Sequence, residues 1–368
     1  MSKFCILGDC GKNECHHCFP VVNCSMNHEY CRKNGICKEI NTKNQEKLIY
    51  REIIVEHKYK ILVTGCAGFI GSHVCEKLLS MEQIVLGVDI MNDYYDVKLK
   101  EKNLEILRQH KNFVFKKEDI CDTKCISEWK PDKIIHLASM AGVRYSIENP
   151  LVYDKINIGG FIHIMEEAVK NNVKNVVYAS SSSVYGLNKK VPFSEEDRIE
   201  SCNSPYACSK LAMEIFAKTY SQLYNIPTIG LRFFTVYGPR GRPDMAPYKF
   251  LNAIKNGTTF NKFGDGTSSR DYTYVGDIVD GIISAMDKKD AKAEIYNLGN
   301  SSPVSLNEFI KTCEDVCDKK ANYEETEMQI GDVPHTYADI AKAKKELGYN
   351  PKVKLKDGLK LFYESENV

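Results

Sequence analysis

The residues best suited to chemistry in this chain are a tyrosine and a lysine, Tyr206 and Lys210, in the run Tyr-Ala-Cys-Ser-Lys. Four residues apart, they share one face of a helix. An unperturbed tyrosine titrates at about pH 10, too high for a good base at neutral pH. A nearby ammonium favours the phenolate and lowers that pKa. Such a pair can take a proton from a sugar hydroxyl while hydride leaves the same carbon, although the same spacing is also common in surface helices.

A nucleotide-binding pattern lies upstream, at residues 60–71. An apolar run over residues 61–63 predicts a buried strand, and an amphipathic stretch over residues 69–80 predicts a helix. The pattern G-x-x-G-x-x-G between them allows a tight turn, a close approach to a pyrophosphate and close packing of helix on strand. The free N–H groups at the start of the helix face the phosphates. The residues concerned are Gly65, Gly68, Phe69, Ile70 and Gly71.

An acidic residue follows at a spacing typical of dinucleotide sites. The apolar run over residues 84–88 predicts a second strand, which ends in Asp89, eighteen residues after Gly71. A carboxylate near this spacing binds the ribose 2′-OH of a dinucleotide. It would repel a 2′-phosphate, so the sequence favours NAD over NADP. A glycine turn between strand and helix can also be purely structural, and this pattern alone is a weak signal.

Strands alternate with helices through the middle of the chain. Further strands are predicted over residues 113–115, 133–136, 175–179 and 228–232, and helices over residues 96–108, 150–171 and 205–224. This alternation predicts an α/β fold with a Rossmann-type doubly wound parallel sheet. Ligands of such sheets lie beyond the carboxyl ends of the strands. One cleft should therefore collect the glycine turn, Asp89, Asp119, residues 137–139, the serines 180–183 and residues 233–235.

After about residue 238 the alternation breaks, and glycine, proline and aspartate become frequent. Short helices are predicted over residues 246–256, 275–286, 305–317 and 340–347. They indicate a smaller C-terminal α/β lobe that closes over the cleft. The predicted divisions are a Cys-rich extension with a linker over residues 1–58, an NAD-binding Rossmann domain over residues 59–238, and mainly a substrate-binding lobe over residues 239–368.

Composition excludes several classes of partner. The 368 residues carry a formal net charge of +1 and no long basic run, so a nucleic-acid partner is not expected. No apolar stretch approaches the roughly eighteen residues that a membrane span needs, and the N-terminus lacks the pattern of a signal peptide. We therefore expect a soluble cytoplasmic protein without a membrane partner.

The N-terminal extension holds seven of the fifteen cysteines within its first 37 residues. Cys15 and Cys18 enclose two histidines at a spacing that suits a zinc knuckle, with the neighbouring cysteines and histidines as further ligands. A segment this poor in aliphatic residues needs a metal or cross-links to fold. Possible zinc binding is one interpretation and a mostly disordered extension is another. A disulfide-stapled knot fits a reducing compartment less well.

The motifs resemble those of a known family, the extended short-chain dehydrogenase/reductases, and among them the nucleotide-sugar 4-epimerases. The main motifs are Thr64–Gly71, His136–Ser139, Tyr178–Gly186 and Tyr206–Lys210. Supporting stretches, most similar to UDP-glucuronate 4-epimerases, are Asn92–Asp96, Ala141–Ser146, Leu231–Pro239, Gly241–Ala246, Arg270–Tyr274, Gly331–Pro334 and Thr336–Asp339. The resemblance runs from about Lys60 to the C-terminus and leaves residues 1–58 outside it. Cys66 departs from it, because a smaller residue such as alanine is usual there.

The resemblance implies a reaction and roles for three catalytic residues. Tyr206 is the general base, Lys210 holds the nicotinamide ribose and tunes Tyr206, and Ser181 shares the hydrogen bond to the sugar O4. Bound NAD takes hydride from C4, the 4-keto sugar rotates about its diphosphate link, and hydride returns to its other face. The keto sugar must stay bound meanwhile, which is one reason for a closing lobe. The helices over residues 150–171 and 205–224 are implied to form a four-helix bundle in a homodimer.

The resemblance and the strand-end positions together give the expected ligand contacts. For NAD they are Gly65, Gly68, Phe69, Ile70, Gly71, Asp89, Asn92, Asp119, Ile120, Leu137, Ala138, Ser139, Asn157, Tyr206, Lys210 and Phe233. For a UDP-sugar they are Arg144, Ser182, Ser183, Thr235, Arg242 and Arg270. Arginine suits two-pronged contact with a diphosphate, as proposed for Arg242 and Arg270. Solvent-facing arginines remain the alternative.

The serine run discriminates among related activities. Sugar 4,6-dehydratases place an Asp-Glu pair where Ser182 and Ser183 stand, and UDP-glucuronate decarboxylases carry a glutamate at the position of Ser183. Thr235 stands where neutral-sugar epimerases have asparagine. Hydroxyl donors suit a carboxylate at C5, so we expect conversion of UDP-glucuronate to UDP-galacturonate. The alternatives are a UDP-glucose or UDP-N-acetylglucosamine 4-epimerase, a 4,6-dehydratase, and a nucleotide-sensing interaction protein without catalysis.

Overall fold

The computed structural model describes residues 58–327 and 333–365. The Cys-rich extension, including Cys15 and Cys18, lies outside the described residues, as does all of the predicted linker except residue 58. The fold reported below is that of the described residues alone.

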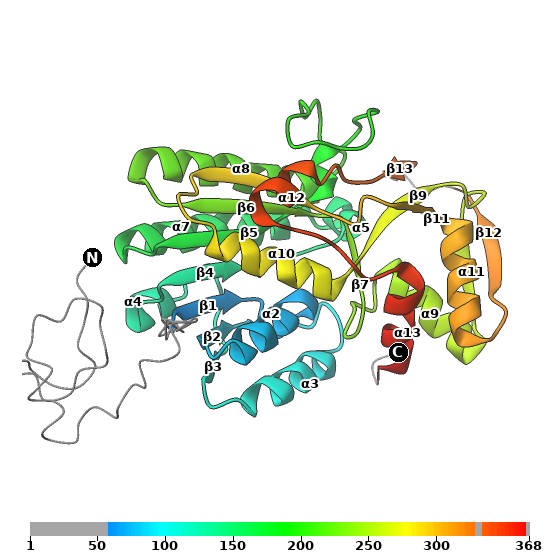
Figure 1. The fold of residues 1–368 in the computed structure, drawn as a ribbon, viewed down its shortest axis with the longest axis horizontal. Helices are drawn as coiled ribbons and strands as arrows, with labels where there is room; N and C mark the ends of the chain where they lie inside the picture. The colour runs from blue at the N-terminus through cyan, green and yellow to red at the C-terminus, as the bar shows by residue number, and fades with distance from the viewer. Residues whose placement is uncertain (1–57, 328–332, 366–368) are drawn as a thin grey trace, which may run out of the picture. The chain divides into compact units, whose positions relative to one another are not determined.

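A seven-stranded, all-parallel sheet forms the centre of the fold, in the order β10-β6-β5-β4-β1-β2-β3. This order is that of a doubly wound nucleotide-binding sheet, as the sequence predicts (Figure 1). The strands are β1 (Lys60–Thr64), β2 (Ile84–Val88), β3 (Phe113–Lys116), β4 (Lys133–His136), β5 (Asn175–Ser181), β6 (Thr228–Phe233) and β10 (Ala293–Leu298).

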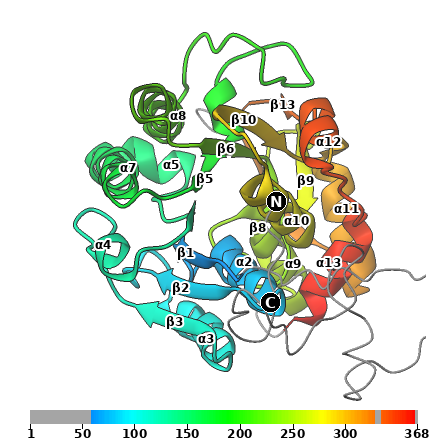
Figure 2. The same cartoon turned by 60° about the vertical axis from the view of Figure 1, so that its left-hand side comes forward.

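Two helical layers bury both faces of the sheet (Figure 2). One layer holds α2 (Phe69–Ser80), α3 (Val97–Arg108) and α10 (Val275–Asp287), and the other holds α4 (Cys125–Trp129), α7 (Phe161–Lys170) and α8 (Pro205–Tyr224). Successive side chains of a strand point to opposite faces. Accordingly Ile61 and Val63 belong to the first core, while Leu62 belongs to the second. This two-sided burial is why β1 is a continuous apolar run in the sequence.

The helix predicted over residues 150–171 is not a single α-helix. It consists of α6 (Pro150–Tyr153), a π-helical stretch (Asp154–Gly160) and α7. Gly160, at the end of the π-helical stretch, packs closely on Ile120, since a Cβ there would lie 2.7 Å from the Ile120 side chain. Helical spacing of apolar residues does not reveal such a local widening, which is frequent at functional sites.

The smaller lobe has its own apolar core, which includes Phe250, Phe309 and Phe362. Its helices are α9 (Ala246–Asn256), α11 (Leu306–Cys317) and α13 (Leu355–Glu364). Its strands are β7 (Thr235–Tyr237), β8 (Thr259–Phe263), β9 (Ser269–Tyr274), β11 (Pro303–Ser305), β12 (Asn322–Thr326) and β13 (His335–Thr336). The predicted bounds of α9, α10, α11 and α12 (Ala341–Leu347) match the structure to within one residue, whereas α4, α13 and the short α5 (Val143–Glu148) are additional to the prediction.

The chain crosses between the two parts more often than a boundary at residue 238 implies. After forming β7 and α9 it returns to the main sheet, where α10 covers one face and β10 pairs with β6. Strand β7 follows β6 directly and pairs with β9 of the small lobe. The lobe is therefore tied to the carboxyl end of β6, which is where the sequence places the cleft.

An ion pair between α8 and β6 is buried in the main domain. The Arg232 guanidinium donates from Nε to Glu214 Oε1 at 2.9 Å and from Nη2 to Oε2 at 2.7 Å. The two side chains are only 6% and 7% exposed, and the Ser180 hydroxyl also donates to Glu214. Ser180 lies on β5, so this cluster locks α8, β5 and β6 together immediately beside the predicted catalytic residues.

Candidate active site

Helix α8 brings Tyr206 and Lys210 to the carboxyl end of β5. Ser204 caps the helix, with its side chain accepting from the Ala207 N–H at 3.2 Å, and Pro205 occupies its first turn. Lys210 is 1% exposed. Its Nζ donates to the Ala179 carbonyl of β5 at 2.8 Å and lies 6.0 Å from the centroid of the Tyr206 ring. The spacing of four residues therefore places both side chains on the face of α8 that meets the sheet.

Ser181, the last residue of β5, lies against the tyrosine. Its hydroxyl is a hydrogen-bonding partner of the Tyr206 phenol, and its oxygen accepts from the Ser183 N–H at 3.2 Å. The Ser181 hydroxyl can thus donate toward an oxygen held beside Tyr206. Ser182 and Ser183 open a short 3₁₀ turn (Ser182–Tyr185) and are half-buried.

The electrostatics of the pair differ from the expectation. Burial raises the pKa of Tyr206, while its hydrogen bond with Ser181 and the Arg242 charge lower it. Lys210 is not among the groups that lower the pKa of Tyr206 here. Burial lowers the pKa of Lys210 itself to about 7, and its amine is turned toward Ala179. In this structure the Arg242 charge favours the Tyr206 phenolate.

Arg242 is fixed by two residues to which the sequence reasoning gave no role. Its Nε donates to Asp244 Oδ1 at 2.9 Å, and its Nη2 also donates to that carboxylate. The Tyr94 hydroxyl donates to Asp244 Oδ2 at 3.3 Å, and the Tyr94 ring lies 5.7 Å below the guanidinium. Both residues belong to motifs that carry the family resemblance. Their place in those motifs is the feature of the sequence that could have identified them.

The other predicted UDP-sugar ligands lie on separate elements. Thr235 opens β7 and pairs with Tyr272 of β9. Arg270 of β9 donates from Nη1 to the carbonyls of Ser269 and Pro334 at 2.9 and 3.2 Å. Arg144 of α5 lies 5.1 Å from the Phe263 ring. Thr235 and Arg144 thus contact residues of the small lobe, and Arg270 bonds its own strand and Pro334.

The glycine turn has the shape that a dinucleotide requires. Gly65 has φ +72°, and its N–H donates to Val88 at 2.7 Å. A Cβ at Gly71 would lie 2.0 Å from the Gly65 carbonyl oxygen, so only glycine allows the helix to pack this closely. Gly68 caps α2 without any side-chain acceptor. The first N–H groups of α2, at Phe69 and Ile70, are therefore suited to a pyrophosphate.

A buried lysine, which the sequence reasoning missed, organises the ribose side of this site. Asp89 accepts from the N–H groups of Ala67 at 3.2 Å and Met91 at 2.9 Å. Lys100 Nζ lies 3.7 Å from Asp89 and donates to the Asn92 side chain at 2.7 Å. It comes from α3, which follows this loop. Lys100 therefore holds the two predicted ribose contacts next to each other.

The remaining predicted NAD contacts lie at the ends of neighbouring strands. Leu137 and Ala138 follow β4, and their N–H groups donate to the Thr64 carbonyl and hydroxyl, both at 3.2 Å. Asp119 and Ile120 follow β3, Ser139 follows Ala138, and Phe233, which ends β6, pairs with Ser181.

Asn157 has a different role from the one expected. Its side-chain oxygen accepts from the Met140 N–H at 2.8 Å, and its nitrogen donates to the Met140 carbonyl and the Ser209 hydroxyl, both at 2.9 Å. The side chain is fully buried. It joins the loop after β4 to α8 and so positions the site, with its amide already occupied.

His136, which ends β4 and was expected to be a packing or cofactor-edge residue rather than a base, should make the fold sensitive to acid. It is 1% exposed, its Nδ1 lies 2.9 Å from the Thr64 hydroxyl, and burial lowers its pKa to about 3. An unfolded histidine titrates at about 6.5, so the unfolded chain binds the proton first. As pH falls from about 6.5 toward 3, the contribution of His136 to the free energy of unfolding should drop by about 1.4 kcal/mol per pH unit.

Urea denaturation at pH 7 and pH 5 measures this effect. His136→Gln should show a smaller loss of unfolding free energy on acidification than the wild type. His110→Gln, at an exposed position, serves as the control and should keep the wild-type dependence. An identical pH dependence in the His136 variant and the wild type contradicts the assignment.

The predicted zinc ligands Cys15 and Cys18 lie outside the described residues. Within residues 58–327 and 333–365, no group of three or more His, Cys, Asp or Glu side chains is placed to hold a metal ion. No helix in these ranges is long and apolar enough to cross a membrane.

Comparison with known proteins places this geometry in a family. A family model described as GDP-mannose 4,6 dehydratase matches residues 62–362. UDP-glucuronate 4-epimerase 2 of Arabidopsis thaliana is 42% identical to the chain over 322 residues, which cover 82% of this chain and 74% of that protein.

Solved structures agree with this placement. The UDP-glucuronic acid 4-epimerase of Bacillus cereus, in complex with UDP-glucuronic acid and NAD, superposes with a TM-score of 0.79 at 36% identity, covering 83% of this chain and 98% of that one. A UDP-glucose 4-epimerase of Thermotoga maritima with UDP-glucose gives a TM-score of 0.75 at 33% identity, covering 83% and 97%. The chain therefore belongs to the extended short-chain dehydrogenase/reductase family of nucleotide-sugar enzymes, which includes the UDP-glucuronate 4-epimerases.

Proposed function

We propose that this chain is an NAD-dependent UDP-sugar 4-epimerase that converts UDP-glucuronate to UDP-galacturonate. The observation that carries the proposal is the placement of Tyr206 and Ser181 together at the carboxyl end of β5, in the sheet that carries the glycine turn. A base and a hydroxyl donor at that edge suit proton removal from a sugar hydroxyl. The relatives named above support the reaction class.

The residues of the chain would handle the proton and hold the sugar. Bound NAD supplies the hydride chemistry by accepting hydride from C4 and returning it to the opposite face. Tyr206 takes the proton from the C4 hydroxyl, and Ser181 donates a hydrogen bond to the same oxygen. The Arg242 charge favours the phenolate while Tyr206 acts as a base. On the return step Tyr206 gives the proton back, which leaves an inverted hydroxyl and no net oxidation.

The preference for a glucuronate rests on the hydroxyl side chains. Ser182, Ser183 and Thr235 offer hydrogen bonds to a carboxylate and bring no acid that would promote elimination of water. A 4-keto glucuronate is a β-keto acid, which loses CO₂ readily if its carboxylate is twisted by a strong cation. In this structure Asp244 holds the Arg242 guanidinium through two hydrogen bonds, so this cation is not free to turn and twist the carboxylate.

Thr235→Asn tests this specificity. We expect kcat/KM for UDP-glucuronate to fall about tenfold or more, because a hydrogen bond to a charged group contributes about 1.5–3 kcal/mol. The value for UDP-glucose should not fall. Thr326→Asn, at the end of β12 in the small lobe, is the control substitution. An unchanged kcat/KM for UDP-glucuronate in Thr235→Asn refutes the assigned role.

The alternative substrates are separated by one assay. Purified full-length protein is incubated with UDP-glucuronate, without added NAD, and the products are separated by chromatography. UDP-galacturonate is the expected product. Turnover of UDP-glucose or UDP-N-acetylglucosamine alone favours a neutral-sugar epimerase, and a 4-keto-6-deoxy product favours a dehydratase. No turnover of any UDP-sugar favours the sensing protein, although a sensor has no need of a buried base.

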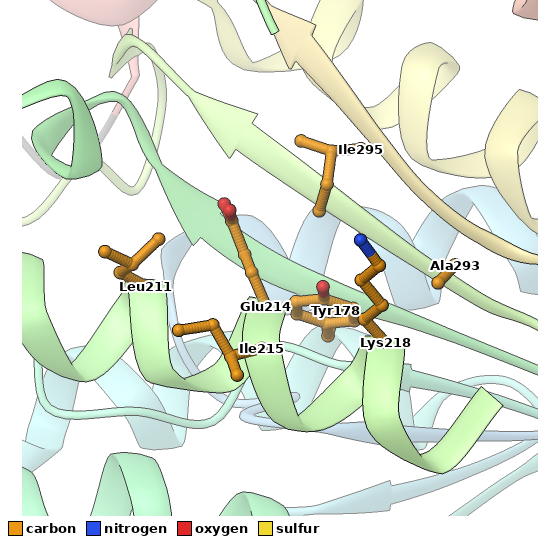
Figure 3. Close-up of a pocket in the computed structure, with 7 residues that line it drawn as sticks. All are labelled: Tyr178, Leu211, Glu214, Ile215, Lys218, Ala293 and Ile295. Carbon is orange, nitrogen blue, oxygen red and sulfur yellow. The ribbon is translucent and has the colours of Figure 1, made fainter. Parts of the chain in front are cut away.

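We also propose that a second copy of this chain pairs, as a four-helix bundle, along helix α8 and the helical stretch that runs from α6 through the π-helical residues to α7. Large apolar side chains are exposed there, including Leu151 at 80% and Ile215 at 60%. Ile215 also lines a pocket of about 170 Å³ between α8 and the sheet-edge strand β10, which contains neither Tyr206 nor Lys210 (Figure 3). Light scattering should give the mass of a dimer, and a monomer mass refutes this assembly.

A further inference from the structure

A largely buried ion pair ties the turn before Arg242 to α2, the helix that follows the glycine turn. Arg240 Nη2 donates to His73 Nδ1 at 2.6 Å and also donates to the Glu76 carboxylate. His73 Nε2 lies 2.9 Å from the Pro239 carbonyl oxygen. The side chains of Arg240, His73 and Glu76 are 9%, 17% and 34% exposed. We call these three side chains the α2 cluster.

The contacts of His73 fix its protonation state. A carbonyl oxygen only accepts hydrogen bonds and a guanidinium only donates them. His73 therefore carries its ring proton on Nε2, donates it to Pro239 and accepts from Arg240 at Nδ1. Burial, and next the Arg240 charge, lower the pKa of His73 to about 4. The ring is thus neutral at physiological pH, and the α2 cluster holds together there.

The turn that the α2 cluster holds has an unusual backbone. Arg240 has φ +62°, which is uncommon for a residue other than glycine and persists where the surrounding contacts impose it. The Gly241 N–H donates to the Gly238 carbonyl at 3.0 Å, and a Cβ at Gly241 would lie 2.8 Å from the Phe362 ring of α13. The turn therefore lies between α2 of the main domain and α13 of the small lobe, and Arg242 is the next residue.

We propose that Arg240 is a positioning residue for Arg242: through the α2 cluster it sets where the Arg242 charge lies relative to Tyr206. Asp244 and Tyr94 orient the Arg242 guanidinium, whereas the α2 cluster holds the backbone from which it projects. The contacts of the cluster exist independently of any reaction. Their effect on turnover rests on the proposed function, so the two are measured separately.

Loss of the Arg240 guanidinium should let the turn relax and displace Arg242. A displacement of about 1 Å away from the chemistry can cost on the order of 10²-fold in rate, so kcat/KM for UDP-glucuronate should fall about tenfold or more in Arg240→Gln. Burial raises the pKa of Tyr206, while the Ser181 hydrogen bond and the Arg242 charge lower it. Displacement of that charge should therefore also move the acid limb of the kcat/KM profile to higher pH.

The other groups that face Tyr206 do not belong to the α2 cluster. Lys210 lies on the same helix with Nζ 6.0 Å from the centroid of the Tyr206 ring, and the ring of Tyr153 of α6 lies 6.1 Å away. Ser181 of β5 is its hydrogen-bonding partner. A moved acid limb therefore reports on Arg242, whereas a general loosening of the fold lowers the rate without moving the limb.

Hydrogen exchange followed by mass spectrometry tests the α2 cluster without reference to activity. The full-length protein and its Arg240→Gln and Glu76→Ala variants are exchanged in deuterated buffer, and peptides that cover residues 238–245 are followed. The N–H groups of Gly241 and Met245 donate to carbonyls within this segment. Because local opening controls exchange, both should exchange several-fold faster in the variants. Glu76→Ala leaves the sequence of the segment unchanged, so wild-type exchange in this variant overturns the proposal.

Lys77→Gln is the matched control on the same helix. It breaks the exposed ion pair between Lys77 and Asp280 of α10, so the exchange of residues 238–245, kcat/KM and the acid limb should all remain as in the wild type. If Lys77→Gln changes them as much as Arg240→Gln does, any charge lost from α2 has the same effect and the proposal is wrong.

Initial rates measured across the pH range complete the test. A fall in kcat/KM of Arg240→Gln with an unmoved acid limb assigns Arg240 to the stability of the fold alone and overturns the positioning role, as does an unchanged kcat/KM. If even the wild type turns over no UDP-sugar, the proposed function fails and the claim about turnover falls with it. The exchange result then still shows whether the α2 cluster holds the segment of Arg242.

Discussion

Replacing Tyr206 with phenylalanine should lower kcat for UDP-glucuronate by about 10²–10⁴-fold, the usual contribution of a general base. The substitution removes one oxygen from a half-buried side chain of helix α8, so the fold should survive. The lost oxygen is the one that Ser181 contacts and that the Arg242 charge stabilises. Initial rates from product chromatography, with the thermal midpoint measured on the same sample, give the answer.

Tyr220→Phe is the matched control for this substitution. It removes the same atom from the same helix, where the Tyr220 hydroxyl donates to Glu166, away from the proposed site. Its kcat should remain within about threefold of the wild type, which is a barrier change of less than about 1 kcal/mol. A Tyr206→Phe enzyme as active as Tyr220→Phe would show that the phenol is not the base.

Glu214→Leu should cause a large loss of stability in the main domain. It leaves the Arg232 guanidinium buried without its carboxylate, and removing one partner of a buried pair costs about 3–5 kcal/mol. The Ser180 hydroxyl loses its acceptor in the same step. The measurement is the free energy of unfolding from urea denaturation monitored by circular dichroism.

The double variant Glu214→Leu/Arg232→Met tests whether the two side chains stabilise the fold as a pair. Replacing both charges with apolar side chains removes the buried charge, so much of the lost stability should return. If the double variant is less stable than Glu214→Leu by the full cost of a second deletion, the two side chains act independently. That outcome would contradict the assigned pairing.

The sheet could be predicted from the sequence because its strands are buried on both faces. Such strands are short apolar runs, as at residues 61–63, and the glycines and polar residues at their carboxyl ends mark the cleft. Helices α9 and α11 of the small lobe were predicted to within one residue because their ends carry clear signals, such as Ser305 at the start of α11 and Gly257 after α9. These strands and helix ends are determined by residues that are close to them in the sequence.

Features that depend on distant residues escaped the sequence reasoning. The π-helical stretch contains Asn157, whose amide bonds both the loop after β4 and helix α8. The return of β10 to the main sheet depends on its pairing with β6, although the chain between them passes through the small lobe before it forms α10. Periodicity carries no information about either contact.

In the candidate active site, too, long-range contacts could not be predicted from the sequence. The sequence identified Tyr206, Lys210 and Ser181 from local motifs and residue types. The structure brings these three residues together. The partners of Arg242 were not identified, because Tyr94 lies 150 residues before Asp244 and reaches it only through the fold. The direction of the Lys210 amine was also unforeseen, since its burial against Ala179 is a tertiary contact.

Isotope transfer tests the central claim most directly. UDP-glucuronate carrying deuterium at C4 is incubated in ordinary water with the full-length protein, and the UDP-galacturonate formed is analysed by mass spectrometry and NMR. The account predicts that deuterium remains at C4 of the product, because the hydrogen removed beside Tyr206 is held as hydride and returned to the same carbon. Hydrogen from water at C4 of the product would contradict it.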